Sequence, residues 1–226
     1  MKTQTFTLTS LFIISSATLF LVSCKKDQNI SNTPGINYQL QTTNRTSTVG
    51  KVESGNIVWT SGYGNATEVK FDAKGPSGDV EYKSSSNQRI DLFSGISSLS
   101  NVTLPAGTYK EVEFKVELNP TATEPALLLN GNYSSTGPAV PIIFSISTPL
   151  EIETEMNDVT VANNSSYKAL TDLNLSTLTT GITQNMIDNA SKTNGSIIIN
   201  SSSNVSLYNI IIANFKASEA IEFKKD

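Results

Sequence analysis

The chain contains no histidine and only one cysteine, Cys24, among its 226 residues. Histidine is the usual general base near neutral pH, the commonest metal ligand and the partner of serine and cysteine nucleophiles. Catalysis by a Ser-His or Cys-His pair is therefore excluded by composition. Carboxylates, hydroxyls and aromatic rings remain as the groups that could carry chemistry.

One set of carboxylates shares a strand face. Glu151, Glu153 and Glu155 alternate with other residues, which spaces them by about 6.6–7 Å along an extended chain. With Asp158 nearby, they could bind Ca²⁺ or act as the carboxylate pair of a glycosidase. A calcium site requires oxygens that converge to within about 2.3–2.6 Å of one ion, which a flat row does not provide. We therefore predict a solvated acidic face, with no metal site and no cofactor.

A second set, Glu111, Glu113 and Glu117, lies beside Lys110 and Lys115, and cross-strand ion pairing is sufficient to explain it. Serine-rich runs at 84–86 and 201–203 lack a G-x-S-x-G context, so we expect no nucleophile there. The sequence predicts that the protein is not an enzyme. A glycan hydrolase acting through carboxylates is the last-ranked alternative.

Four aromatic residues could form a stacking platform for sugar rings: Trp59, Tyr63, Tyr82 and Tyr109. Trp59 has the same parity as Ile57, which predicts that it lies in the core. Tyr63 lies between two glycines in a stretch that predicts a hairpin or bulge. Tyr63 is therefore the better exposed candidate for ligand binding.

Residues 1–23 have the features of a secretory signal peptide, with Lys2 followed by a short apolar run and a small residue before the break. The sequence Leu21-Val22-Ser23-Cys24 matches the bacterial lipobox, in which cleavage leaves the cysteine first and a diacylglyceryl group on its sulfur. We predict lipidation of Cys24; the alternatives are a buried free thiol or a chance cysteine at the end of an ordinary signal peptide. Because each buried methylene contributes about 0.8 kcal/mol, several acyl chains would hold the protein at the membrane.

Residues 24–35 are polar and end in Pro34-Gly35, which predicts a flexible tether, and residues 36–226 form one predicted domain. With 38% hydrophobic residues, the chain has enough apolar material for a core. A net charge of −4 and an isoelectric point near 5.0 argue against nucleic acid as a partner, and the membrane is reached through the lipid instead.

Apolar and polar residues alternate through most of the domain, which is typical of antiparallel strands with one buried face. The clearest example is 109–118, where Val112, Phe114, Val116 and Leu118 face one way. Turns are predicted at 62–65 and 74–79. Other predicted strands lie at 36–40, 57–59, 69–71, 80–82, 89–93, 126–130, 142–146, 150–156, 159–162 and 167–175. The predicted fold is mainly β, an antiparallel β-sandwich of the immunoglobulin-like or prealbumin-like kind.

Two short helices are predicted near the C-terminus. In the first helix, Thr183 caps the start and Asn194-Gly195 closes the end. The second helix follows a Ser203-Asn204 cap. Between the two helices, residues 197–199 are predicted to form a short strand, and at the C-terminus residues 222–226 are expected to fray. The apolar positions at helical spacing are Ile182, Met186, Ile187 and Ala190, then Val205, Tyr208, Ile211, Ile212 and Phe215.

The segment Leu104-Pro105-Ala106-Gly107-Thr108-Tyr109 directly precedes the alternating strand that ends at Leu118. This arrangement resembles uncharacterised β-sandwich domains of bacterial lipoproteins, abundant in Bacteroidota, in which an L-P-A-G-x-Y turn launches a central strand. The resemblance continues through 126–131, 179–183 and 203–208, and it implies no catalytic residues. In the turn itself, Pro105 fixes φ near −65° and Gly107 is expected to supply a positive φ.

In lipoproteins of this kind, a lysine and acids after the cysteine mark export to the outer face of the outer membrane, and Lys25-Lys26-Asp27 is similar with one acid. The leading hypothesis is an outer-membrane lipoprotein, exposed at the cell surface, whose loops bind a glycan or another envelope component. The alternative is a structural or assembly subunit of an envelope complex.

Overall fold

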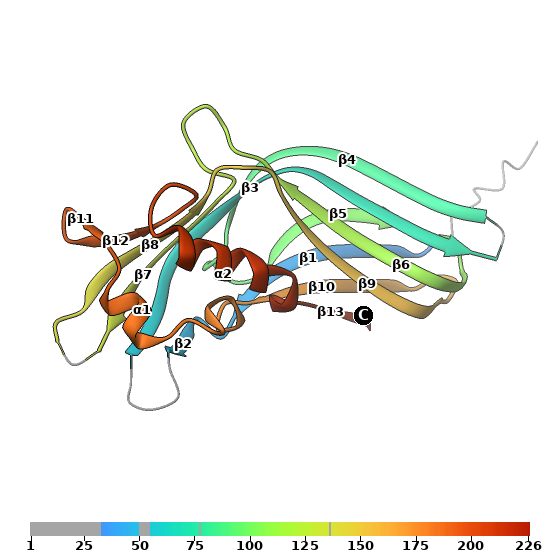
Figure 1. Ribbon diagram of the computed structural model, residues 1–226. Helices are drawn as coiled ribbons and strands as arrows, with labels where there is room; N and C mark the ends of the chain where they lie inside the picture. Colours follow the sequence, from blue (N-terminus) through green and yellow to red (C-terminus); the bar gives the residue numbers. More distant parts are fainter. Residues whose placement is uncertain (1–32, 50–54, 77, 136) are drawn as a thin grey trace, which may run out of the picture. The chain divides into compact units, whose positions relative to one another are not determined.

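The computed structural model describes residues 33–49, 55–76, 78–135 and 137–226 and is mainly β (Figure 1). The predicted signal peptide, Cys24 and residues 24–32 of the predicted tether lie outside the described residues. Residues Asn32–Asp226 form one compact unit. At its start Pro34 is buried and its carbonyl accepts a hydrogen bond from the Leu104 N–H at 3.1 Å.

The smaller of two open sheets has four strands in the order β13-β10-β1-β5. These are β1 (Gly35–Thr43), β5 (Ser97–Thr103), β10 (Ser166–Asn174) and β13 (Glu219–Lys225). β1 and β10 pair in parallel, so the prediction of a purely antiparallel fold is wrong for this pair. Alternation fixes which face of a strand is buried, but it carries no information on the direction of its partner.

The larger sheet has nine strands, with a main path in the order β11-β12-β8-β7-β3-β6-β9 and with β2 and β4 paired to β3. β12 and β8 form a second parallel pair. The strands are β2 (Thr46–Val49), β3 (Gly55–Gly75), β4 (Gly78–Asp91), β6 (Gly107–Leu118), β7 (Leu127–Ser134), β8 (Val140–Ile146), β9 (Leu150–Val161), β11 (Lys192–Thr193) and β12 (Ser196–Ile199).

β3 organises the larger sheet because its 21 residues run through both halves of it (Figure 1). Gly64 pairs with β7 on one edge and β4 on the other, whereas Ala66 pairs with β6 and β4. β7 and β6 therefore follow one another along the same edge of β3. This arrangement divides the sheet into a β7–β8–β12 half and a β6–β9 half.

The predicted hairpin or bulge at 62–65 is instead an uninterrupted part of β3, with register shifts on both sides of it. Gly62, at the start of this segment, allows β7 to pack closely against β3. A Cβ on Gly62 would lie 2.6 Å from the Leu128 carbonyl oxygen and 2.7 Å from a Leu129 methyl group. The glycines that predicted a turn at 62–65 therefore indicate a close approach of the neighbouring strand, β7.

Side chains from the two sheets meet at Phe114 of β6. Its ring stacks on Tyr38 of β1 at 4.7 Å between centroids and meets Phe71 of β3 edge-on at 4.9 Å. The Tyr38 hydroxyl, Thr171 and Thr154 form a buried hydrogen-bonded chain with 3.1 Å at each step. The predicted inward face of residues 109–118 is confirmed, because Val112, Phe114, Val116 and Leu118 are all buried.

Most predicted strands are present, but several are longer. The segments 150–156 and 159–162 are one strand, β9, and 80–82 and most of 89–93 both belong to β4. The expectation that 222–226 fray is wrong, because β13 pairs with β10 along its length. Phe223 of β13 stacks on Tyr167 of β10 at 5.0 Å between ring centroids, which adds a side-chain contact to the strand pairing.

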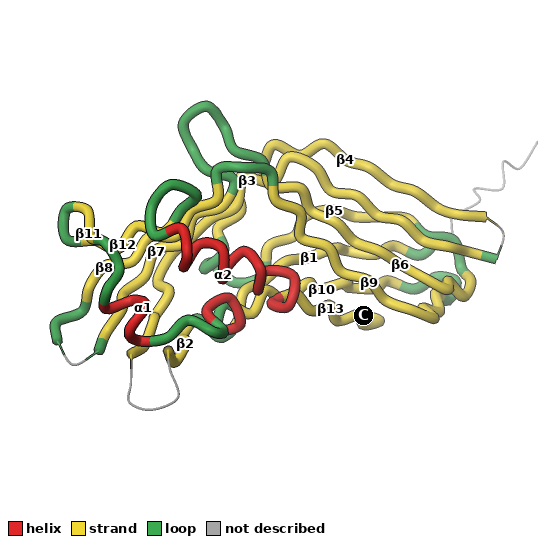
Figure 2. Tube along the Cα trace, viewed as in Figure 1, coloured by secondary structure: helices red, strands yellow, loops and turns green. Residues whose placement is uncertain are grey.

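Helices gather against the β7–β8–β12 half (Figure 2). The first, α1 (Gln184–Asp188), is capped as predicted, with the Thr183 side chain accepting from the Met186 N–H. It ends six residues earlier than predicted from Asn194-Gly195, which instead forms the β11–β12 turn with φ of 50° and 80°. Positive φ at both residues matches a type I′ hairpin, a competing use of the same Asn-Gly signal.

The second helix, α2 (Val205–Phe215), begins after Asn204 as predicted. Asn204 adopts a φ of 50°, and its side chain does not cap the helix but donates to the carbonyls of Ser191 and Ile198. Short 3₁₀ turns at Thr177–Thr179 and Lys216–Ser218 complete the helical segment. Tyr208 of α2 packs against Phe144 of β8 at 6.0 Å between ring centroids.

The turn before β6 is held by a tyrosine. The Tyr109 hydroxyl donates to the Pro105 carbonyl at 2.8 Å, four residues upstream. The predicted positive φ at Gly107 is wrong: the positive-φ glycines of the described chain are 78, 95, 181 and 195, and Gly107 is the first residue of β6. The bulk of Tyr109 is accommodated by Gly75, where a Cβ would lie 2.8 Å from the ring.

Candidate ligand-binding pocket

The predicted acidic residues lie on a charged face of the larger sheet, formed by β4, β3, β6 and β9. Lys115 bonds to Glu113 at 3.0 Å and reaches Glu153 on the next strand at 3.6 Å. Lys110 bonds to Asp158 at 3.0 Å. The predicted cross-strand pairing is therefore confirmed. Within the described ranges, no three acidic or cysteine side chains are grouped so that they could hold a metal ion.

Further ion pairs continue this pattern toward β4. Lys70 lies between Glu68 and Glu117, and the Glu117 carboxylate is the main cause of a raised Lys70 pKa. Lys83 of β4 bonds to Glu68 at 2.7 Å and is the main cause of a lowered Glu68 pKa. The lysines on this face bond to its carboxylates and offset part of their negative charge.

The aromatic candidates do not form a platform. Trp59 is 2% exposed, which confirms the prediction that it lies in the core. The expectation that Tyr63 is exposed is wrong, because it is 8% exposed in the middle of β3. The Arg89 guanidinium lies 3.6 Å from the centre of its ring and also bonds to Glu124 at 2.6 Å. This face of the Tyr63 ring is thus already occupied; its role in ligand binding stays a prediction.

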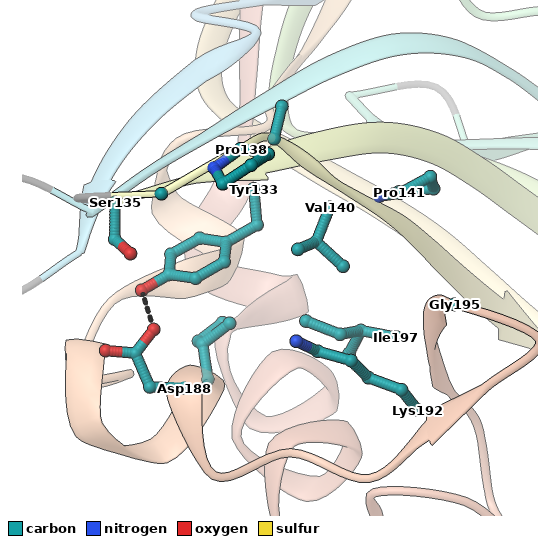
Figure 3. Close-up of a pocket in the computed structure, with 12 residues that line it drawn as sticks. Tyr133, Ser135, Pro138, Val140, Pro141, Asp188, Lys192, Gly195 and Ile197 are labelled. Carbon is teal, nitrogen blue, oxygen red and sulfur yellow. Dashed lines mark hydrogen bonds between the residues drawn. The ribbon is translucent and has the colours of Figure 1, made fainter.

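A pocket with a volume of about 470 Å³ lies at the end of the β7–β8–β12 half of the larger sheet (Figure 3). Three segments distant in sequence form its walls: the β7–β8 connection, the end of α1 and the β11–β12 hairpin. The parallel pairing of β12 with β8 brings the hairpin beside the start of β8. The lining residues are Tyr133, Ser135, Gly137, Pro138, Ala139, Val140, Pro141, Ile187, Asp188, Lys192, Gly195 and Ile197.

A hydrogen-bonded pair fixes one wall. The Tyr133 hydroxyl donates to Asp188 Oδ1 at 2.8 Å, and Gln184 Nε2 donates to Asp188 Oδ2 at 3.2 Å. Burial, with a contribution from Asp188, raises the pKa of Tyr133 to about 12, although the Ser135 hydroxyl acts in the opposite direction. Tyr133 therefore keeps its proton at neutral pH and remains the donor. The Asp188 side chain is exposed and retains lone pairs that can accept from a ligand.

Lys192 supplies the positive charge of the pocket. Its ammonium group points into the space between Val140 and Asp188 (Figure 3). Of the ion pairs formed by the described residues, none includes Lys192. A lysine that lacks a protein carboxylate and points into a cavity can bind an acceptor group of a ligand.

The remaining walls are apolar and conformationally restricted. Pro138 and Pro141 have no N–H donor and a fixed φ, and Val140 and Ile197 add aliphatic surface. The pocket volume falls in the range of about 300–1,000 Å³ that is typical of small-molecule sites. Apolar walls with a few polar groups suit a ligand that has both C–H faces and hydroxyl groups.

Sequence reasoning did not identify Tyr133, Asp188 or Lys192. Residues 133 and 188 are 55 positions apart, and no short motif links them. The weak signals were Pro138 and Pro141, in the β7–β8 connection and at the start of β8, and the Asn194-Gly195 turn, which we expected to end a helix. Within the described chain, no helix has the length and apolar character needed to cross a membrane.

Comparison with known proteins adds no further assignment, because no family model, curated protein or solved structure matches the chain. The resemblance to lipoprotein β-sandwich domains therefore stays a prediction.

Proposed function

We propose that this protein is a lipid-anchored, non-enzymatic module of the cell envelope that binds a glycan in the pocket beside Tyr133. The observation that carries the proposal is the combination of an acceptor, Asp188, and an unpaired ammonium, Lys192, in one cavity with proline-rich walls. Sugars present hydroxyl groups that both donate and accept, together with C–H faces that pack on apolar surface. The pocket provides a partner for each of these groups.

The proposed architecture is an immunoglobulin-like or prealbumin-like sandwich. The Tyr38–Phe114 and Phe71–Phe114 ring contacts support it, since they join the inner faces of the two sheets. A hydrogen bond from the Glu153 N–H of β9 to Glu219 of β13 adds support at one edge, at 3.1 Å. In this arrangement the pocket belongs to loops at one end of the larger sheet, which is a common location for binding sites on β scaffolds.

The proposed location is the outer membrane, through acylation of Cys24, with the domain exposed at the cell surface. A non-enzymatic role is supported by the absence of histidine and by the pairing of the strand-face carboxylates with lysines. The Asp188 carboxylate is likewise engaged by protein groups, because its two oxygens accept hydrogen bonds from Tyr133 and Gln184. A carboxylate held in this way is suited to orienting a hydroxyl group.

A glycan array probed with the full lipidated chain in detergent micelles tests the proposal. We expect reproducible binding to a subset of glycans, and loss of that binding in Asp188→Ala. Asp79→Ala is the matched control, because Asp79 is an exposed aspartate of β4 and is not among the residues that line the pocket. The proposal is wrong if no glycan is retained, or if both variants bind as the wild type does. Discrete heteromeric cross-links in intact cells would then favour the assembly-subunit alternative.

A further inference from the structure

We propose that the pocket selects acidic glycans, with Lys192 binding the carboxylate of a uronic acid while Asp188 accepts hydrogen bonds from hydroxyl groups of the same ligand. This inference rests on the proposed glycan-binding function and specifies its ligand class. It starts from the two charged residues that line the pocket, Asp188 and Lys192, which do not form an ion pair with each other.

The lack of a partner distinguishes Lys192 from most lysines of the described chain. Seven others form ion pairs with carboxylates, namely Lys70, Lys74, Lys83, Lys110, Lys115, Lys168 and Lys224. In a protein with a net charge of −4, carboxylates are the more abundant charged group. An ammonium group left without one, and directed into a cavity, is available to a negatively charged ligand (Figure 3).

Asp188 restricts which anions can enter. The Tyr133 hydroxyl and Gln184 donate to its two oxygens and hold the carboxylate on the opposite wall of the cavity. An anion without hydroxyl donors would meet this charge with no compensating hydrogen bond. A uronic acid places its carboxylate and several hydroxyl groups on different parts of one ring, so it can satisfy Lys192 and Asp188 together.

The apolar residues favour a sugar ring over a small inorganic anion. Pro138, Val140 and Pro141 line one side of the pocket, and Ile197 lies on the β12 side. Such surface packs against the C–H groups of a pyranose, whereas phosphate or sulfate would find the Lys192 ammonium and the Ser135 hydroxyl but no bidentate guanidinium. Arginine and backbone N–H groups are the usual partners of those anions, and the pocket contains no arginine.

Titration calorimetry tests the inference with the full lipidated chain in detergent. The ligands are oligosaccharides of galacturonate, glucuronate, mannuronate and guluronate, and the same oligosaccharides after reduction of each carboxyl to a hydroxymethyl group. We expect the acidic forms to bind at least about tenfold more tightly, equivalent to 1.4 kcal/mol. The preference should decrease as NaCl is raised from about 0.05 to 0.5 M, because salt screens an ammonium–carboxylate contact.

Lys192→Gln should remove the preference for the acidic forms, whereas Lys225→Gln should retain it. Lys225 is an exposed lysine of β13 and is not among the residues that line the pocket. The control therefore makes the same change in charge away from the pocket. Equal binding of acidic and reduced forms by the wild type would overturn the inference and leave glycan binding intact. Binding of neither form would overturn the inference, and retention of no glycan on the array would in addition overturn the proposed function.

Discussion

At the scale of single residues, the hydrogen bond between Tyr133 and Asp188 joins the end of β7 to α1. A phenol is protonated at physiological pH, and burial raises the pKa of Tyr133 further, to about 12, so Tyr133 is the donor in this bond. A donor of fixed direction orients the carboxylate that faces the pocket. The pair therefore has a role in both stability and ligand binding.

Tyr133→Phe should lower the free energy of unfolding by about 1 kcal/mol, because the lost hydrogen bond ends on an exposed carboxylate. Glycan affinity should fall as well, since Asp188 loses its orienting donor. Urea denaturation measures the first effect and calorimetry the second. Tyr208→Phe is the control, as Tyr208 packs on Phe144 and its hydroxyl has no hydrogen-bond partner within the described chain. Equal effects of the two substitutions would contradict this account.

Glu219 should make stability depend on pH. Burial is the main cause that raises its pKa to about 7, and the Glu153 N–H and Lys216 act in the opposite direction. The folded state therefore binds a proton more tightly than the unfolded chain, whose glutamate titrates near 4.5. This contribution to stability is present at low pH and is lost as pH rises through the window from about 4.5 to 7.

Glu219→Gln retains a hydrogen-bond acceptor for the Glu153 N–H and removes the titrating group. The difference in unfolding free energy between wild type and variant should therefore change by about 1–2 kcal/mol between pH 5 and pH 8, after allowance for solvent screening. The wild type should lose stability relative to the variant at the higher pH. Urea denaturation at both pH values measures this difference, and parallel pH profiles for the two proteins would exclude the role of Glu219.

At the scale of elements, β6 contributes most directly to the contact between the sheets, through Phe114. This side chain is fully buried and touches aromatic rings of β1 and β3. Phe114→Ala should cost about 3–5 kcal/mol in unfolding free energy, measured by thermal or urea denaturation. Glu113→Ala, on the opposite face of the same strand, should cost less than about 1 kcal/mol. A small effect of Phe114→Ala would mean that the inner face is wrongly assigned.

The sequence predicted β6 well because its alternation is unbroken and local. The prediction failed for β3 because two closely spaced glycines, Gly62 and Gly64, are typical of a turn. In the structure these glycines instead leave room for β7 and for the Leu118 side chain, which are distant in sequence. The prediction also failed for β13, whose charged residues conceal the alternation of Ile221 and Phe223. Strand pairing and close approach are long-range properties, and local periodicity does not encode them.

The pocket was not predictable for the same reason. Its acceptor comes from α1, its cation from β11, Pro138 from the β7–β8 connection and Pro141 from β8. The parallel pairing of β12 with β8 determines their proximity, and an antiparallel sandwich was expected. By contrast, the charged strand face was predictable, because ion pairs between adjacent strands follow directly from alternating Glu and Lys residues.

At the scale of the whole molecule, the lipid anchor determines where the pocket operates. Cys24→Ser should prevent acylation, so the protein should remain unprocessed or be released from membranes. Incorporation of a palmitate analogue and membrane fractionation are the measurements, with the wild-type chain as the positive control. Unchanged label and unchanged partitioning into membranes would contradict the proposed anchor.

The central claim is that a glycan binds between the β7–β8 connection, α1 and the β11–β12 hairpin. Mapping of backbone amide chemical shifts by NMR, during titration with a glycan retained on the array, tests this claim most directly. We predict that the largest shifts occur at residues 133–141 and 187–197, and that Asp188→Ala abolishes them. Shifts centred on Tyr63 and Arg89, or on the charged face of β4, β3, β6 and β9, would contradict the account.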